Sequence, residues 1–159
     1  MKYRIGQGVD FHRLVEERDL WLGGVLIPHT KGALGHSDAD VLLHAICDAI
    51  LGAASLGDIG THFPDTDDHY KGIDSKVLLQ LTFNLVHQKG YKIVNVDSTL
   101  CLQEPKIKSF VPEMQAVIAN ILHIDTADVS IKATTTEKLG FVGREEGLVA
   151  YASVLLQKP

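Results

Sequence analysis

Asp10 and His12 stand two residues apart in a segment whose alternating pattern predicts a β-strand, so their side chains leave the same face. That face also carries Gly6 and Gly8, which leave room for a close approach. His44 follows on an expected helix, away from its apolar stripe. One carboxylate and two imidazoles suit Zn²⁺ with an open coordination position. On spacing alone, a strand end and a solvated helix histidine explain these residues more simply, and only the neighbouring motifs favour a metal site.

The residues around His44 offer partners for its ring and a place for an anion. Asp40, His44 and Asp48 recur every four residues, so one helix face carries all three, and either carboxylate can orient His44. Just before the helix, Ser37 or Asp38 can act as its N-cap. The free N–H groups and the positive dipole end of a helix start also suit phosphate.

Acidic residues recur in the segment after this helix, where Gly57–Gly60 leads to Phe63–Asp67. Such residues can close turns, bind hydroxyl groups or bind a cation. For Asp65 and Asp67 taken alone, turn formation is the simpler role.

The segment Lys132–Phe141 contains three successive threonines followed by Glu-Lys and a glycine. Continuation of a strand explains one threonine but not three. The hydroxyls and Lys138 can bind phosphate oxygens, while Glu137 can hold a hard cation such as Mg²⁺ or Mn²⁺. Arg144 follows, and its guanidinium suits phosphate, although a salt-bridged hairpin turn explains it equally well.

The elements that must position these residues follow from the periodicity. It predicts strands over residues 3–12, 93–102, 129–133 and 148–156, a hairpin over 20–27, and helices over 40–51, over 74–89 and from Pro112. Residues 52–74 are expected to be irregular, and loops of that length are usually functional or mobile. This order predicts an α/β (α+β sandwich) fold with one mixed four-stranded sheet, helices on one face and a small hairpin. Without repeats or a linker, residues 1–159 are expected to form a single domain.

Composition limits the classes of function. Hydrophobic residues make up 45% of the chain and charged residues 22%, as in an ordinary globular protein. The formal charge of -5 argues against a nucleic-acid binder, and no apolar stretch is long enough for a membrane span. The N-terminus lacks signal-peptide character, and Cys47 and Cys101 lie in apolar runs as buried thiols would. A cytoplasmic location is therefore expected.

Taken in order, these motifs resemble the 2-C-methyl-D-erythritol 2,4-cyclodiphosphate synthase family over essentially the whole chain. The matching segments are Gly8–His12, His36–Asp40 with His44, Leu51–Gly60, Phe63–Asp67 and Lys132–Phe141. Several long motifs in a fixed order are more specific than any one of them.

The resemblance implies roles for individual residues. Asp10, His12 and His44 would bind Zn²⁺, and Glu137 would help to hold a second divalent cation, Mg²⁺ or Mn²⁺, on the substrate's diphosphate. His36 and Thr135 match positions that stabilise the transition state, and the segment Leu102–Lys108 matches the cradle for cytosine. The substrate-binding residues implied in this way are Ser37, Asp58, Ile59, Gly60, Phe63, Pro64, Asp65, Thr66, Asp67, Leu102, Gln103, Glu104, Pro105, Lys106, Ile107, Lys108, Thr134, Thr136, Phe141 and Arg144.

The resemblance also implies the reaction and the assembly. In this family, 4-diphosphocytidyl-2-C-methyl-D-erythritol 2-phosphate forms the cyclic diphosphate and releases CMP, in the non-mevalonate isoprenoid pathway. The substrate's 2-phosphate attacks its own β-phosphate, so the protein must position the reacting groups and offset their charge rather than supply a nucleophile. A ferredoxin-like fold is implied, in a homotrimer with active sites between subunits. An isoprenoid diphosphate is a further candidate ligand for a central cavity near Arg144.

Two other functions remain open from the residues alone. A metal-dependent phosphohydrolase would use a similar Asp/His set and release inorganic phosphate. A non-enzymatic metal- or nucleotide-binding module predicts a closed site with four ligands, whereas the sequence offers three.

Overall fold

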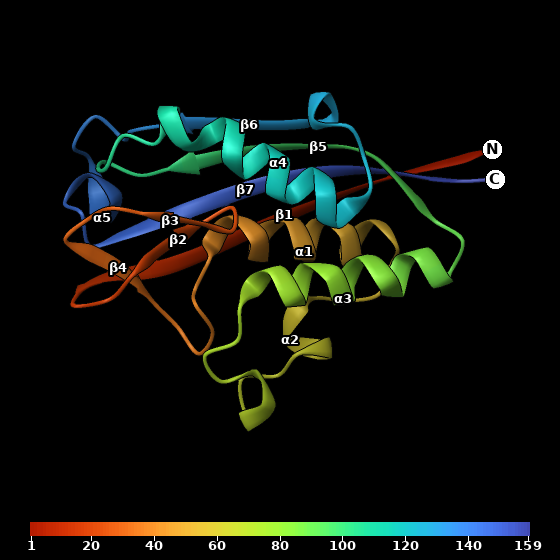
Figure 1. Cartoon of the computed structure of the whole chain (residues 1–159), viewed down its shortest axis with the longest axis horizontal. Helices are drawn as coiled ribbons and strands as arrows, with labels where there is room; N and C mark the ends of the chain where they lie inside the picture. Colours follow the sequence, from red (N-terminus) through yellow and green to blue (C-terminus); the bar gives the residue numbers. More distant parts are fainter.

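The computed structural model describes residues 1–159, and Figure 1 shows its elements in chain order. The strands are β1 (Lys2–Glu16), β2 (Leu20–Leu22), β3 (Val25–Ile27), β4 (Lys31–Leu34), β5 (Lys92–Cys101), β6 (Val129–Thr134) and β7 (Gly147–Lys158). The α-helices are α1 (Val41–Ala53), α2 (Ile59–His62), α3 (Ser75–Gln88), α4 (Val111–Leu122) and α5 (Gly140–Gly143). Three 3₁₀ turns complete the list: η1 (Asp68–Tyr70), η2 (Lys108–Phe110) and η3 (Thr126–Asp128). No helix combines the length and hydrophobicity that crossing a bilayer requires.

The main sheet is mixed and has the strand order β4-β1-β7-β5-β6. Only β5 and β6 run parallel, and α4 lies in the connection between them. The predicted α+β class is confirmed, but the expected four strands are five. The fifth forms because β1 continues past His12 and its last residues, from Arg13 to Glu16, pair with the four-residue β4. The hairpin expected at residues 20–27 is confirmed as the separate pair β2–β3.

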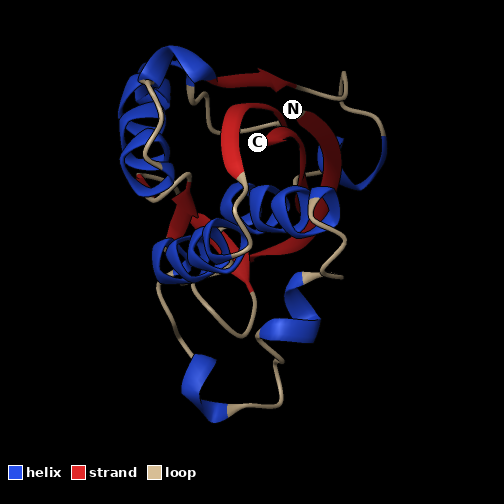
Figure 2. Ribbon diagram, turned by 90° about the vertical axis from the view of Figure 1, so that its right-hand side faces the viewer, coloured by secondary structure: helices blue, strands red, loops and turns tan.

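Helices α1 and α4 cover one side of the curved sheet, and α3 packs against both of them on that same side, so the helices lie on one face as expected (Figure 2). The opposite face of the sheet carries large apolar side chains that have no cover within the chain. Ile5 is 81% exposed, and Tyr3, Phe11 and Tyr151 are also exposed there. On β1 the apolar side chains therefore face outward, whereas the glycines and the Asp10–His12 pair face α1.

Gly6 and Gly8 let the backbone of α1 lie directly against β1. A Cβ atom at Gly8 would sit 1.9 Å from the Ala45 carbonyl oxygen, and one at Gly6 would sit 1.9 Å from that of Ala49. Helix α1 is consequently buried on nearly all sides, and Leu42, Leu43 and Ile46 are fully inaccessible. The close approach predicted from the two glycines is thus made by the helix that carries His44.

The segment expected to be irregular contains two short turns, α2 and η1, which lie beyond α1 and α3 on the side away from the sheet (Figure 1). Asp58 caps α2 by accepting a hydrogen bond from the Thr61 N–H. Asp67 caps η1 by accepting one from the His69 N–H, so the turn-forming role expected for Asp67 is confirmed.

The two ends of the chain lie side by side, because the first residues of β1 pair with the last residues of β7 (Figure 1). Lys2 is opposite Lys158, and His12 is opposite Leu148 at the other end of the same ladder. Ten residues of strand, about 33 Å, therefore separate the termini from the Asp10–His12 end of β1.

The contact between β1 and α1 gives a first prediction. Gly8→Ala should lower the free energy of unfolding by about 3 kcal/mol or more, because the new methyl group must push a helix backbone away. Gly52→Ala is the matched control, because Gly52 faces the same strand from α1 and its Cβ would meet nothing closer than 3.9 Å. That variant should be neutral or stabilised by about 0.5–1 kcal/mol. Urea unfolding of both proteins measures the difference, and equal stabilities would contradict the required close approach.

Candidate metal centre

Asp10, His12 and His44 converge where the end of β1 meets α1. Asp10 Oδ2 lies 2.9 Å from His12 Nε2 and 3.2 Å from His44 Nδ1, and the two nitrogen atoms lie 3.2 Å apart. All three side chains are half-buried. The sequence predicted that Asp10 and His12 share one face of a strand. The structure places His44, more than thirty positions later in the chain, opposite them.

The triangle of ligand atoms fits a metal ion. In a tetrahedral zinc site with bonds of about 2.0–2.1 Å, neighbouring ligand atoms lie about 3.3 Å apart. The three measured edges, 2.9, 3.2 and 3.2 Å, are close to that value without any rearrangement. These three residues form the group that could hold a metal, and with only three protein ligands a coordination position stays open.

The electrostatics of the metal-free group reflect its close packing. Burial tends to raise the pKa of Asp10, but hydrogen bonds from His12 and His44 outweigh it and lower that pKa to about 2. Burial tends to lower the pKa of His12, but its hydrogen bond to Asp10 and the negative charge of that carboxylate raise it overall. The other ring nitrogen of His12, Nδ1, lies 2.9 Å from the Leu34 carbonyl oxygen and donates to it, which leaves Nε2 facing the centre.

The predicted partners of His44 are wrong. Asp40 is fully buried and accepts hydrogen bonds from the N–H groups of Gly23, Gly24 and Leu43, so it ties the β2–β3 turn to the start of α1. Burial raises its pKa to about 6, against the effect of these backbone donors. Asp48 instead accepts a hydrogen bond of 2.7 Å from the Ile59 N–H. One helix face is wide enough for the three side chains to point to different neighbours.

Two serines contact His44 in place of the aspartates. His44 Nε2 lies 2.8 Å from Ser75 Oγ and 3.2 Å from Ser37 Oγ. The N-cap of α1 is Asp40, not Ser37 or Asp38, because Ser37 and Asp38 accept from the N–H groups of Ala39 and Asp40 within the preceding turn.

A cavity of about 450 Å³ opens directly beside the metal centre. It brings His36 and Ser37 together with residues of the loop around α2 and with His12 and His44. The loop residues expected at the site that line it are Ile59, Gly60, Phe63, Pro64 and Asp65. Asp58 and Asp67 hold the turns next to it, and the Asp67 carbonyl oxygen lies 3.3 Å from His36 Nε2. Thr66 is exposed between Asp65 and Asp67.

A second cavity, of about 340 Å³, joins the other two segments singled out in the sequence. Its lining is the whole run Leu102–Lys108 together with Ala133, Thr134 and Thr135. The two cavities share no residue. Segments that are separate in the sequence meet here because β5 and β6 are neighbouring parallel strands that end at the same edge of the sheet.

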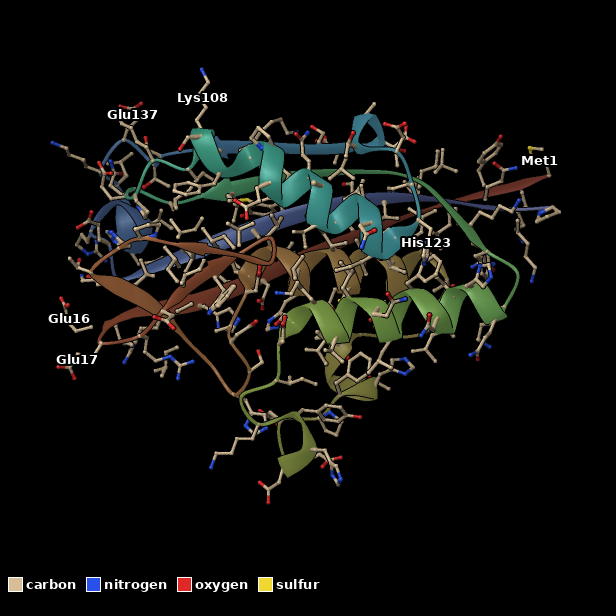
Figure 3. All side chains as sticks on the ribbon, viewed as in Figure 1. Met1, Glu16, Glu17, Lys108, His123 and Glu137 are labelled. Carbon is tan, nitrogen blue, oxygen red and sulfur yellow. The ribbon has the colours of Figure 1, made fainter.

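Besides Asp10, Asp58, Thr66 and Asp67, four expected site residues from the C-terminal part of the chain line neither cavity. Thr136 donates to the Leu139 carbonyl oxygen, and Glu137 is exposed at the same end of the molecule as Lys108 (Figure 3). Phe141 lines a small cavity of about 260 Å³ with Phe11, Arg13 and Glu146. Arg144 pairs with Glu146 at 2.7 Å, as the salt-bridge interpretation expects.

Sequence reasoning missed five residues that contact the site. Gly35, Tyr70, Ile73 and Leu78 line the first cavity, and Ser75 contacts His44. Ile73 lay in the segment expected to be irregular, and Ser75 and Leu78 lay in an expected helix with no sign of a site role. Only the contact between α1 and α3 makes them neighbours of the centre.

Comparisons with known proteins match essentially the whole chain to one family. The model of the YgbB family matches residues 3–157. A "2-C-methyl-D-erythritol 2,4-cyclodiphosphate synthase" from Bacteroides fragilis is 61% identical over 158 residues, 99% of each chain. A solved synthase in a "bound form CDP" is 38% identical with a TM-score of 0.89, covering 97% of this chain and 100% of that one. The bifunctional IspDF from Campylobacter jejuni is 46% identical with a TM-score of 0.96, and the match covers 99% of this chain but only 43% of that longer one.

Removing one ligand tests the centre. His44→Ala should weaken Zn²⁺ binding by at least about 100-fold. Loss of a residue that only hydrogen-bonds to a metal ligand typically costs about 10–100-fold, and loss of the ligand itself should cost more. His87→Ala is the matched control, since His87 is an exposed histidine on α3 outside the group. Competition with a chromophoric chelator measures both affinities. Equal affinities in the two variants would exclude His44 as a ligand.

Protons should compete with the metal. The pKa of His12 is raised, so its imidazole begins to take up a proton at a higher pH than a free histidine, and only the neutral ring binds a metal. Affinity for Zn²⁺ should therefore fall as the pH falls through the neutral range, approaching about tenfold per pH unit for one competing proton. Chelator competition at pH 8, 7 and 6 measures the slope, and a flat profile would contradict a site built on His12.

Proposed function

Because this chain belongs to the YgbB family of 2-C-methyl-D-erythritol 2,4-cyclodiphosphate synthases, we propose that its Asp10–His12–His44 centre is the core of the active site. The activity is that of a cyclodiphosphate synthase, a lyase-type enzyme of isoprenoid biosynthesis. The 2-phosphate of 4-diphosphocytidyl-2-C-methyl-D-erythritol 2-phosphate attacks the β-phosphorus, and CMP leaves. The observation that supports the proposed centre most strongly is the triangle of ligand atoms at the edge of a 450 Å³ cavity.

Two cations complete the proposed site. Bound Zn²⁺ on Asp10, His12 and His44, and Mg²⁺ or Mn²⁺ on Glu137 and the diphosphate, would supply positive charge that offsets the repulsion between phosphates. Zinc is favoured for the first because two imidazoles and a carboxylate are its usual ligands. A carboxylate oxygen at Glu137 suits the harder cation.

The first cavity takes the phosphates and the polyol. His36 and Ser37 lie beside the metal ligands and donate hydrogen bonds to phosphate oxygens, and His36 stabilises the charge of the transition state. The loop residues Ile59 to Asp67 enclose the polyol, with Asp58 and Asp67 holding its turns. Rigid positioning of both ends of a flexible polyanion brings the attacking and leaving oxygens into line.

The second cavity takes the cytidine. Its walls are the run Leu102–Lys108 with Thr134 and Thr135, and Thr135 and Glu137 act on the diphosphate next to it. Support comes from the related solved synthase in a form bound to CDP. Phe141, Thr136 and Arg144 belong to the same end of the molecule but line neither cavity.

A homotrimer brings the two kinds of cavity together, the first from one subunit and the second from its neighbour. Two features support it: the cavities of one chain share no residue, and the open face of the sheet exposes Ile5, Phe11 and Tyr151. Apolar patches of this kind are usually covered by a partner. The chain acts as one catalytic domain in the cytoplasm.

An isoprenoid diphosphate is the proposed ligand of the small cavity near Arg144. Phe11 and Phe141, whose ring centroids lie 6.2 Å apart, offer an apolar wall, and Arg13 lines the same cavity. Glu146 already pairs with Arg144, so a bound diphosphate would compete with that carboxylate for the guanidinium.

Turnover of the proposed substrate tests the function. With Zn²⁺ and Mg²⁺ or Mn²⁺ present, the protein should release one CMP for each cyclic diphosphate formed, measured by chromatography and phosphorus NMR. Removal of metal by a chelator should abolish turnover and readdition should restore it. His44→Ala should be inactive, whereas the His87→Ala control should retain wild-type turnover.

Failure of the metal-loaded wild type to form CMP would contradict the proposed reaction. Release of inorganic phosphate in place of CMP would identify a phosphohydrolase.

A further inference from the structure

Behind His44, on the side away from Asp10 and His12, a buried serine links the imidazole to a carboxylate. Ser75 is the first residue of α3 and is fully inaccessible. His44 Nε2 lies 2.8 Å from Ser75 Oγ, and the Ser75 hydroxyl in turn bonds to Asp38 Oδ1. The Ser75 N–H also donates to Asp38, to Oδ2 at 3.0 Å. The resemblance, the metal ligands and the two cavities assign no role to Ser75 or to Asp38.

The hydrogen atoms in this chain of contacts have one consistent arrangement. The Asp38 carboxylate only accepts, and it receives the Asp40 N–H together with both donors of Ser75. Ser75 has a single hydroxyl hydrogen, and the bond to Asp38 uses it. Ser75 Oγ therefore accepts from His44, so the hydrogen of the imidazole sits on Nε2.

Ser37 also favours a hydrogen on His44 Nε2. Its Oγ accepts from the Ala39 N–H and lies 3.2 Å from His44 Nε2, where a second lone pair can share the Nε2 hydrogen. With Nε2 held by these hydroxyls, Nδ1 is the ring nitrogen that faces Asp10 and His12, and its lone pair is available to a metal whenever Nδ1 carries no proton.

We propose that Ser75, held by Asp38, is a positioning residue of the metal centre that fixes the ring orientation and the tautomer of His44 before a metal binds. The inference rests on the metal-binding role given to His44 in the proposed function, and deepens it. Metal-binding histidines are commonly fixed by a carboxylate or a carbonyl on the other ring nitrogen, and His12 has such a partner in the Leu34 carbonyl. For His44 the partner is the buried Ser75 hydroxyl, which is itself hydrogen-bonded to the Asp38 carboxylate.

The same contacts tie the ring to the end of the substrate loop. Asp38 N–H donates to the Ile73 carbonyl at 3.1 Å, and Gly72 N–H donates to the His36 carbonyl at 2.7 Å. Two backbone bonds thus join the turn before α1 to the residues just before Ser75. This frame explains why a helix-start residue can act as a rigid support for His44.

Three variants test the proposal. Ser75→Ala removes the nearer of the two acceptors for the Nε2 hydrogen and should weaken Zn²⁺ binding by about 10–100-fold. Ser75→Thr keeps the hydroxyl and should restore most of that affinity. Asp74→Ala is the matched control, because Asp74 caps the same helix through the Lys76 N–H without touching His44. It should lower the midpoint of unfolding and leave the zinc dissociation constant unchanged.

The measurements are chelator competition for zinc and the ring ¹⁵N chemical shifts of His44 in the metal-free protein. The wild type should carry the hydrogen on Nε2, and Ser75→Ala should show a mixture of tautomers. Wild-type zinc affinity in Ser75→Ala, or an equal loss in Asp74→Ala, would overturn the proposal. If Ser75→Ala does not fold, the wild-type spectrum decides, since a His44 ring with its hydrogen on Nδ1 and none on Nε2 overturns the proposal. A wild type that binds no zinc would sink the proposed metal centre, whereas the tautomer measurement would still judge the role of Ser75.

Discussion

The structure depends on one steric constraint, the direct contact of the α1 backbone with β1. Side chains larger than hydrogen at Gly6 and Gly8 would collide with carbonyl oxygens of the helix. Their absence brings α1 close enough for His44 to reach Asp10 and His12, so the metal triangle is a consequence of how tightly a helix can approach a strand. The fully buried face of α1 supplies the core that holds this approach in place. A looser interface would separate ligand atoms that now lie within 3.2 Å.

Much of this arrangement was readable in the sequence because local rules set it. Period-two alternation put Asp10 and His12 on one face, and helical periodicity located α1 and α3. The direction in which β1 faces was not readable, since its apolar residues turn away from the helices and its glycines turn toward them. Strand β4 was missed because its four residues carry little pattern, and its pairing with the extension of β1 is a tertiary event.

The partners of the site residues were harder to predict than the residues themselves. Helical spacing predicted that Asp40 or Asp48 orients His44. Such spacing shows only that side chains share a helix face, and it does not determine which neighbouring residue each one contacts. Asp40 accepts hydrogen bonds from the backbone of the β2–β3 hairpin, and Asp48 accepts one from the first residue of α2. The side chain that contacts His44 instead is Ser75, which belongs to another helix, α3. Both cavities likewise join segments far apart in the chain, which local pattern alone would have left separate.

The pairing of the first residues of β1 with the last residues of β7 determines where other protein segments can be joined to this chain. Both chain ends emerge together, a strand's length from the metal ligands (Figure 1). A short linker between Lys2 and Lys158 would span neighbouring strands only about 5 Å apart, so the order of the elements along the chain could be permuted without moving a ligand. Fusion partners attached at either end would likewise project from the far side of the molecule. The architecture therefore separates the place where the chain can be joined to other proteins from the place where chemistry occurs.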